Sequence, residues 1–289
     1  LKVPKKFYDR MRRDHPDLFD ETINGLLHRE PEQRMVRFLD GQARAFLSDR
    51  YKRIDNYEVL GNVLPILQEE PDLQVHSCEV TDRRLYLKVV TPRVQGEVAE
   101  GDVVQSGIVL KNSEVGLGKV MVAPMVYTLA CQNGAIVERF GKGKYHIGAK
   151  LEASEDVERL LSDETRKADD NALVLKLRDI VKAAMSRDVF DQILEDLRES
   201  KERQVDNPTQ AVERLCQKFG MAYARDDLTQ AFFESSHRTG YSQYGLLNAV
   251  TRYSQQVEDY DKATDLESLG GKILALNRSE WREIAEAQE

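Results

Sequence analysis

The chain has 289 residues, of which 42 are Lys or Arg, 50 are Asp or Glu and 41% are hydrophobic. This length suits one large domain or two modest ones, and the composition is typical of a folded globular protein rather than a disordered chain. The net charge of -8 divides into +2 over residues 1–150 and -10 over residues 151–289. Because charges farther than about 8–10 Å are screened, a cationic surface on residues 1–150 can still bind phosphate.

The composition also favours the cytoplasm. No stretch approaches the roughly 18–20 apolar residues of a membrane span, and the basic start of the chain is unlike a signal peptide. Cys78, Cys131 and Cys216 are odd in number and far apart, which suits a reducing compartment better than a disulfide framework. We therefore expect a cytoplasmic protein that has no membrane partner.

Helical spacing dominates the first 70 residues. Apolar side chains recur at intervals of three or four from Glu30 to Tyr51, which predicts one or two short helices there. Asn56 is the predicted cap of a further helix that runs to Glu69, with a kink or an early end at Pro65.

The period changes to two after Pro71, which predicts strands. Asn133-Gly134 is the strongest turn signal among them, since both residues tolerate positive φ. Together these segments predict a mostly antiparallel sheet of about five strands, over residues 73–80, 85–91, 103–111, 119–131 and 135–140.

Helical patterns return at Ser154 and continue to the end of the chain. Ser186 and the pair Asn207-Pro208 are predicted helix starts, and Gly220 and Gly240 are predicted stops. The order of helices, sheet and helices predicts an α+β fold. We expect residues 1–150 to form the sheet core with its N-terminal helices, and residues 151–289 to form a helical region.

Catalytic signatures are weak throughout the sequence. Residues 116–120 lack the first glycine and the final Ser or Thr of a phosphate-binding loop, and residues 141–144 lack the full dinucleotide-binding pattern. The histidines show no metal-ligand spacing, and the chain has no Gly-x-Ser-x-Gly element. We therefore expect no catalytic residue, no metal and no cofactor, and we name no enzyme activity.

Basic residues interleaved with tyrosines form three clusters, and Lys111 is a weaker candidate beside a glycine loop. Guanidinium and ammonium groups bind phosphate, and tyrosine rings stack on unpaired bases with about 1–3 kcal/mol each. The alternative is that these residues are ordinary solvated turns. The candidates for nucleic-acid binding are Arg50, Tyr51, Lys52, Arg53, Arg83, Arg84, Lys111, Arg139, Lys142, Lys144, Tyr145 and Lys150.

Residues 235–251 form a second unusual segment, in which small, polar and aromatic side chains precede an amphipathic pattern. Three interpretations stay open for it: a conformational hinge, the rim of a ligand site, or a helix packed closely through Gly245 and Ala249.

Four segments resemble, in the same order, elements of a phage- and plasmid-encoded protein family catalogued as a domain of unknown function. The first has Arg50-Tyr51 before Asn56, the second ends a strand in Asn112-Ser113, the third contains Cys131-Gln132-Asn133, and the last contains Asn248-Ala249-Val250-Thr251. The resemblance covers about Phe46 to Tyr253. It implies an origin in mobile genetic elements, and it implies no established activity.

A sheet with helices before and after it is also the general plan of phage single-strand annealing proteins such as Redβ and the ERF type. The leading hypothesis is therefore a homo-oligomer that binds single-stranded nucleic acid, preferably DNA, in the cytoplasm of a bacterial host. Such a protein would anneal strands in recombination or replication. The alternatives are a host-takeover protein that binds a protein partner through its acidic helical half, and an unrecognised nuclease.

Overall fold

The computed structural model describes residues 5–29, 34–48, 54–118, 120–130, 132–138 and 163–286. The chain divides into two compact units, Leu1–Lys52 and Arg53–Glu289. The domain boundary that the sequence predicts at residues 150/151 lies outside the described residues.

The first unit contains two helices and a β-hairpin, namely α1 (Lys5–Asp14), α2 (Pro16–Arg29), β1 (Arg34–Leu39) and β2 (Gln42–Ser48). The hairpin shows that the prediction of helix between Glu30 and Tyr51 was wrong. Asp40 and Gly41 take φ values of 51° and 76°, and two successive residues with positive φ make the tight turn that joins antiparallel strands. The apolar residues on either side of this turn fit the two faces of a hairpin as well as one face of a helix.

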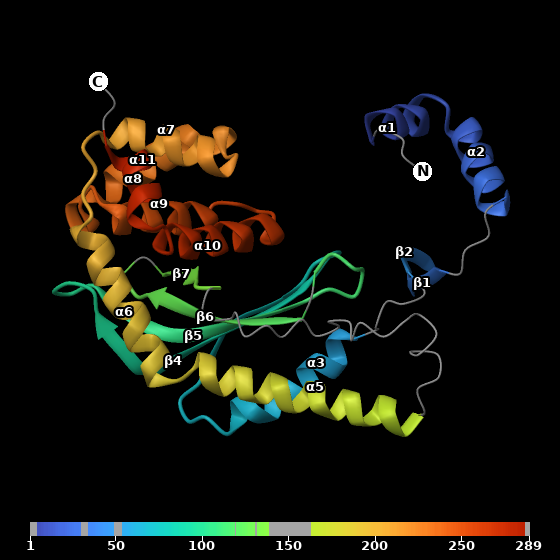
Figure 1. Cartoon of the computed structure of the whole chain (residues 1–289), viewed down its shortest axis with the longest axis horizontal. Helices are drawn as coiled ribbons and strands as arrows, with labels where there is room; N and C mark the ends of the chain where they lie inside the picture. Colours follow the sequence, from blue (N-terminus) through green and yellow to red (C-terminus); the bar gives the residue numbers. More distant parts are fainter. Residues whose placement is uncertain are drawn as a thin grey trace. The chain divides into compact units, whose positions relative to one another are not determined.

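The second unit is built on a five-stranded sheet in which every neighbouring pair is antiparallel, in the order β3-β4-β5-β6-β7 (Figure 1). The predicted antiparallel sheet of about five strands is therefore confirmed. The strands are β3 (Gln74–Val80), β4 (Leu85–Glu97), β5 (Val103–Asn112), β6 (Met121–Thr128) and β7 (Asn133–Ile136).

The last hairpin differs from its prediction. Asn133 and Gly134 lie within β7, where they pair with Thr128 and Tyr127, so the turn lies before them. Gln132, at φ 54°, belongs to that turn. The side chain of Asn133 is buried and donates a hydrogen bond to Thr251 Oγ1 at 2.7 Å, which holds this residue in the strand.

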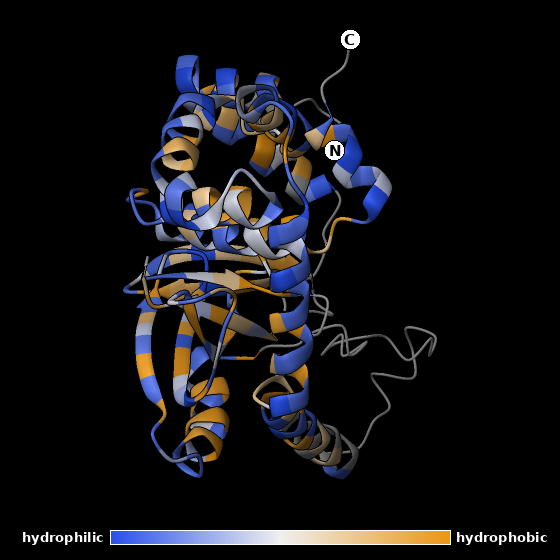
Figure 2. Ribbon diagram, turned by 90° about the vertical axis from the view of Figure 1, so that its left-hand side faces the viewer, coloured by the Kyte–Doolittle hydropathy of each residue, from blue (hydrophilic) through white to orange (hydrophobic). Residues whose placement is uncertain are grey.

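Helices cover both faces of the sheet. The helices α3 (Asn56–Gln68) and α5 (Asp163–Ala184) lie below it in Figure 1, and the C-terminal helices lie above it; the same layers appear in the perpendicular view of Figure 2. Helix α6 runs past the sheet from one layer to the other. The remaining helices are α6 (Arg187–Glu202), α7 (Pro208–Phe219), α8 (Arg225–Thr239), α9 (Gln243–Ser254), α10 (Tyr260–Leu274) and α11 (Arg278–Ala285).

The helix ends agree closely with the sequence. Ser186 accepts a hydrogen bond from the Val189 amide, Asn207 accepts one from the Gln210 amide, and Gly220 ends α7 with a φ of 70°. Helix α3 begins one residue earlier than predicted, with Asp55 rather than Asn56 as its N-cap, and continues through Pro65 to Gln68. The predicted α+β class and the helical C-terminal region are confirmed, and no described helix has the length and apolarity needed to span a membrane.

Candidate functional site

A lysine lies buried between the sheet and α10. The alternation of β4 directs Leu87 and Val89 toward α3 and α5, so Lys88 points to the opposite face. Its Nζ lies 2.6 Å from Glu267 Oε2, and the two side chains are only 5% and 13% exposed. The ammonium group also lies 4.7 Å from the centre of the Tyr260 ring. These contacts pair a charge that would be costly to bury alone.

Other ionisable groups surround this pair. Lys111, two strand positions away on β5, donates to Ser268 Oγ at 2.8 Å and lies 3.7 Å from the Glu138 carboxylate. Tyr86 donates to Asp261 Oδ1 at 2.6 Å. Burial lowers the pKa of Lys111, and burial followed by the Asp261 hydrogen bond raises the pKa of Tyr86. We call these groups, Tyr86, Lys88, Lys111, Glu138, Asp261 and Glu267, the charged layer. Because its members bind one another, the charged layer holds α10 on the sheet.

Three of the predicted nucleic-acid-binding residues are described. Arg83 is exposed at the β3–β4 turn. The guanidinium of Arg84 donates twice to Leu117 O, at 3.2 and 3.0 Å, and Lys111 belongs to the charged layer. The other candidates lie outside the described residues, so their convergence on one groove stays a prediction: Arg50, Tyr51, Lys52, Arg53, Arg139, Lys142, Lys144, Tyr145 and Lys150.

The four resembling segments meet in pairs. Asn112 of the second segment donates to Asn56 Oδ1 of the first at 2.8 Å and to Ile54 O at 3.2 Å. Asn133 of the third segment donates to Thr251 of the last at 2.7 Å. The shared side chains of these segments therefore join α3 to β5 and α9 to β7, so they have an architectural role.

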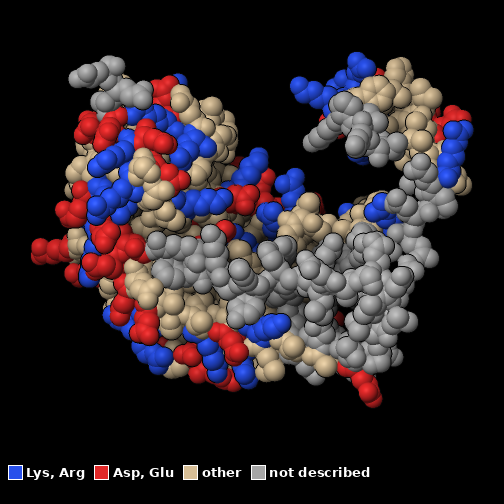
Figure 3. Space-filling view, viewed as in Figure 1, with Lys and Arg blue, Asp and Glu red and all other residues tan. Residues whose placement is uncertain are grey.

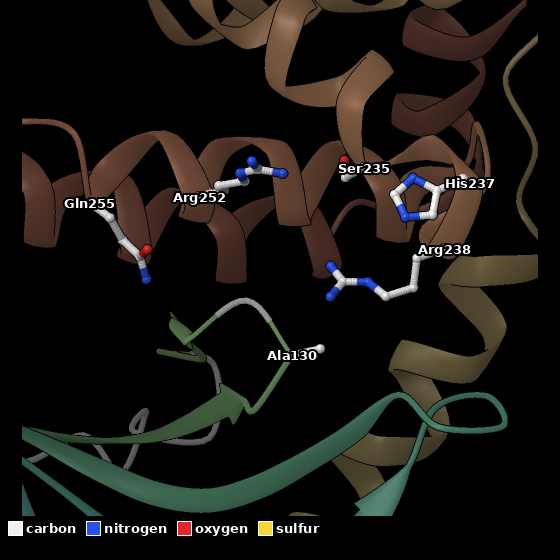
Figure 4. A pocket seen from close by; sticks show the side chains of 6 residues that line it. All are labelled: Ala130, Ser235, His237, Arg238, Arg252 and Gln255. Carbon is white, nitrogen blue, oxygen red and sulfur yellow. The ribbon is translucent and has the colours of Figure 1, made fainter.

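A pocket of about 270 Å³ opens between α8, α9 and the β6–β7 turn (Figure 4). We call it the α8–α9 pocket. The two helices approach each other closely at Gly245, where a Cβ would lie 2.3 Å from Gly240 O and 2.8 Å from Phe232 Cε2. The lining residues are Ala130, Ser235, His237, Arg238, Arg252 and Gln255.

The lining of the α8–α9 pocket is rich in hydrogen-bond donors and contains no carboxylate. In Figure 4 the guanidinium groups of Arg238 and Arg252 extend into the same space. Arg252 also lies 3.1 Å from Glu234, and both of these side chains are well exposed, at 37% and 45%. The Ser235 hydroxyl and the Gln255 amide both donate to backbone carbonyl oxygens. The two guanidinium groups and the imidazole are therefore the groups that suit an anionic oxygen group such as phosphate.

A second buried polar pair lies at the N-terminal end of α9. Tyr244 donates to Asp102 Oδ2 at 2.8 Å, and both residues are at most 1% exposed. Burial and then the Asp102 charge raise the pKa of Tyr244, whereas the charge of Arg238 acts in the opposite direction. The Asp102–Tyr244 hydrogen bond therefore joins α9 to the sheet in the interior of the fold.

A family model described as "Domain of unknown function (DUF932)" matches residues 45–281. The chain belongs to this family. No curated protein and no solved structure matches the chain. The DUF932 region includes the charged layer and the α8–α9 pocket, whereas α1, α2 and β1 precede it.

Charges of both signs are interspersed over α7, α8 and α11 on the face shown in Figure 3, so the DUF932 region presents no large surface of one sign there. Among the residues that the structure describes, no group of three or more His, Cys, Asp or Glu side chains is placed to hold a metal ion. The α8–α9 pocket is a local cationic site through its own lining, which contains Arg238 and Arg252 and no carboxylate.

Sequence reasoning identified part of this site. Ser235, His237 and Arg238 lie in the segment 235–251, for which both a ligand rim and close packing were considered. The structure shows the close packing at Gly245 and places these three residues at a pocket, and the ligand rim stays a prediction. Arg252 and Gln255 follow that segment and were missed. Lys88 was also missed, although a lysine within the apolar run 85–90 was a signal of a buried, paired charge.

Proposed function

We propose that this DUF932 protein binds single-stranded nucleic acid, with DNA favoured, and that the α8–α9 pocket receives a backbone phosphate. The observation that carries the proposal is a pocket in which Arg238, Arg252 and His237 meet without a lining carboxylate. Guanidinium groups form charge-assisted hydrogen bonds with phosphate oxygens, and these contacts are insensitive to base sequence.

The proposal extends to annealing of complementary strands by a homo-oligomer of phage or plasmid origin in the cytoplasm of a bacterial host. Annealing needs no nucleotide, because base pairing supplies the free energy. An oligomer would hold a strand at many weak sites at once, which raises the overall affinity. The resemblance to the phage- and plasmid-encoded family supports this part of the proposal.

The test is fluorescence anisotropy with a labelled single-stranded oligonucleotide while the salt concentration is raised from about 50 mM, where phosphate contacts are strong. Arg252→Gln should weaken binding to all sequences alike and reduce the slope of log affinity against log salt by about 1, because one phosphate contact is lost. Arg252 is the better position than Arg238, since its side chain is 37% exposed and its replacement leaves the core intact.

Arg282→Gln is the matched control. Arg282 lies on α11, is 71% exposed and makes an ion pair with Glu286 at 3.5 Å, so its replacement also breaks one surface ion pair. This control should bind like the wild type. Absence of wild-type binding at about 50 mM salt would contradict the proposed function, and equal binding by the two variants would exclude the α8–α9 pocket as the phosphate site.

A further inference from the structure

The hairpin of the first unit exposes large aromatic side chains. Phe38 is 65% exposed and Phe46 is 72% exposed, and Leu39 at the turn is 52% exposed. Isolated exposed apolar residues are common, but two phenylalanine rings on one short hairpin form a patch that marks an interaction site. We call β1, β2 and their turn, residues 34–48, the aromatic hairpin.

The strand register leaves both rings uncovered. Phe46 pairs with Val36, and Phe38 pairs with Ala43, so neither ring faces a large neighbour across the hairpin. A bulge between Arg37 and Phe38 shifts the register between the two pairs. The Asp40-Gly41 turn fixes the pairing of the two strands, so the backbone positions that carry the rings are set by the hairpin itself.

The charges near these rings favour an anionic partner. The aromatic hairpin contains Arg34, Arg37 and Arg44 against a single acidic residue, Asp40. The three arginines make contacts of their own within the chain, so the rings carry the argument and the arginines provide the cationic surroundings. In the same compact unit, α1 has five basic residues and two acidic ones.

We infer that the aromatic hairpin is a base-stacking site for single-stranded nucleic acid. Exposed rings in cationic surroundings match a ligand that offers unpaired bases on a phosphate backbone. The inference rests on the proposed function and adds the contact with the bases, in a unit separate from the α8–α9 pocket. The DUF932 match begins at residue 45, so most of the aromatic hairpin precedes the family region.

The experiment compares two labelled strands of equal length, an oligothymidylate and an abasic strand that keeps every phosphate and lacks the bases. The variant Phe38→Leu/Phe46→Leu removes both rings but keeps apolar side chains. It should bind the oligothymidylate about 5- to 150-fold more weakly than the wild type, the range expected for one stacked base, and bind the abasic strand as the wild type does.

The matched control is Tyr57→Leu, which removes a ring that is 78% exposed on α3. This control should bind both strands as the wild type does. Phe46→Trp provides a second readout, because an exposed indole at position 46 should restore stacking and its fluorescence should be quenched by the oligothymidylate but not by the abasic strand. Circular dichroism melting of each variant shows that folding is retained.

The outcomes separate this inference from the proposed function. Failure of the wild type to bind either strand would overturn both. Wild-type binding that the double variant leaves unchanged, or weakens equally on both strands, would overturn the stacking site and leave the proposed function standing. A change of mass in light scattering with unchanged binding would make the aromatic hairpin a protein contact, and would also overturn the inference.

Discussion

The two faces of the central sheet are built from different chemistry. The face toward α3 and α5 is aliphatic, and Leu87, Ile108 and Leu110 pack there against both helices. The face toward α10 carries the buried Lys88 and the half-buried Lys111. One alternating strand, β4, supplies residues to both faces, so the contrast arises within a single run of sequence.

The aliphatic face contributes more to stability than the charged layer, which instead determines where α10 lies on the sheet. Apolar burial contributes about 25 cal/mol per Å² and is non-directional, so many arrangements of α3 and α5 would be nearly as good. A buried ion pair gains little over apolar residues of the same size, but it is costly when one partner moves away. The charged layer therefore adds little net stability and strongly favours one position of α10 on the sheet.

The largest expected effect comes from breaking one pair of the charged layer. Lys88→Met leaves the Glu267 carboxylate buried and without its cation, since these two side chains are only 5% and 13% exposed. We expect the free energy of unfolding to fall by about 3–5 kcal/mol, as measured by urea denaturation.

Two further variants sharpen this result. Lys88→Met/Glu267→Met removes both charges and should recover most of the lost stability, because no unpaired charge remains. Lys182→Met is the matched control, since Lys182 forms an exposed pair with Glu69 at 3.3 Å, and it should cost about 0–1 kcal/mol. An effect of Lys88→Met as small as this control would show that the charged layer does not fix α10.

The parts of the fold that the sequence predicts are those whose signals lie in neighbouring residues. Alternation of apolar residues identifies the five strands, and local chemistry identifies the helix ends at Ser186, Asn207 and Gly220, because both signals are contained in neighbouring residues. The hairpin at Asp40-Gly41 was missed although its turn signal is local, since apolar spacing was given more weight than turn chemistry.

The candidate site is less predictable because its parts are distant in sequence. The α8–α9 pocket joins Ala130 of the β6–β7 turn to residues of α8 and to Gln255 beyond α9. Lys88 likewise finds its partner Glu267 on α10, and periodicity carries no information on such a pairing. Charge clusters along the chain predicted Arg84 as a phosphate ligand, which stays a prediction, but they did not indicate that its guanidinium donates to Leu117 O and Tyr86.

The aliphatic face should respond more mildly than the charged layer. Ile108 is 1% exposed, and Ile108→Val removes one methylene group from a face that can partly close around the gap. We expect the free energy of unfolding to fall by about 0.5–1.5 kcal/mol with an unchanged dependence on urea. The control is Val80→Ala on β3, 59% exposed, which should cost less than about 0.5 kcal/mol. A loss as large as that of Lys88→Met would remove the distinction between the faces.

The smallest effect concerns His76, on β3, whose ring centre lies 4.6 Å from that of Tyr127. Burial and then the charge of Lys88 lower the pKa of His76 below its usual 6.5. The unfolded chain therefore binds this proton more readily, so the free energy of unfolding should decrease as the pH falls from above 6.5 toward the lowered pKa. Because His76 remains in contact with solvent and its side chain is only partly buried, the decrease should be slight, and His76→Gln should remove it.

An NMR titration of His76 connects this effect to the charged layer. In Lys88→Met/Glu267→Met the pKa of His76 should rise, because the nearby cation is gone, yet stay below its usual value, because burial is the larger cause and remains. Lys182→Met should leave the titration unchanged. If the double variant also leaves it unchanged, burial alone lowers the pKa, and the charge of Lys88 acts only on its partner Glu267 rather than across the sheet.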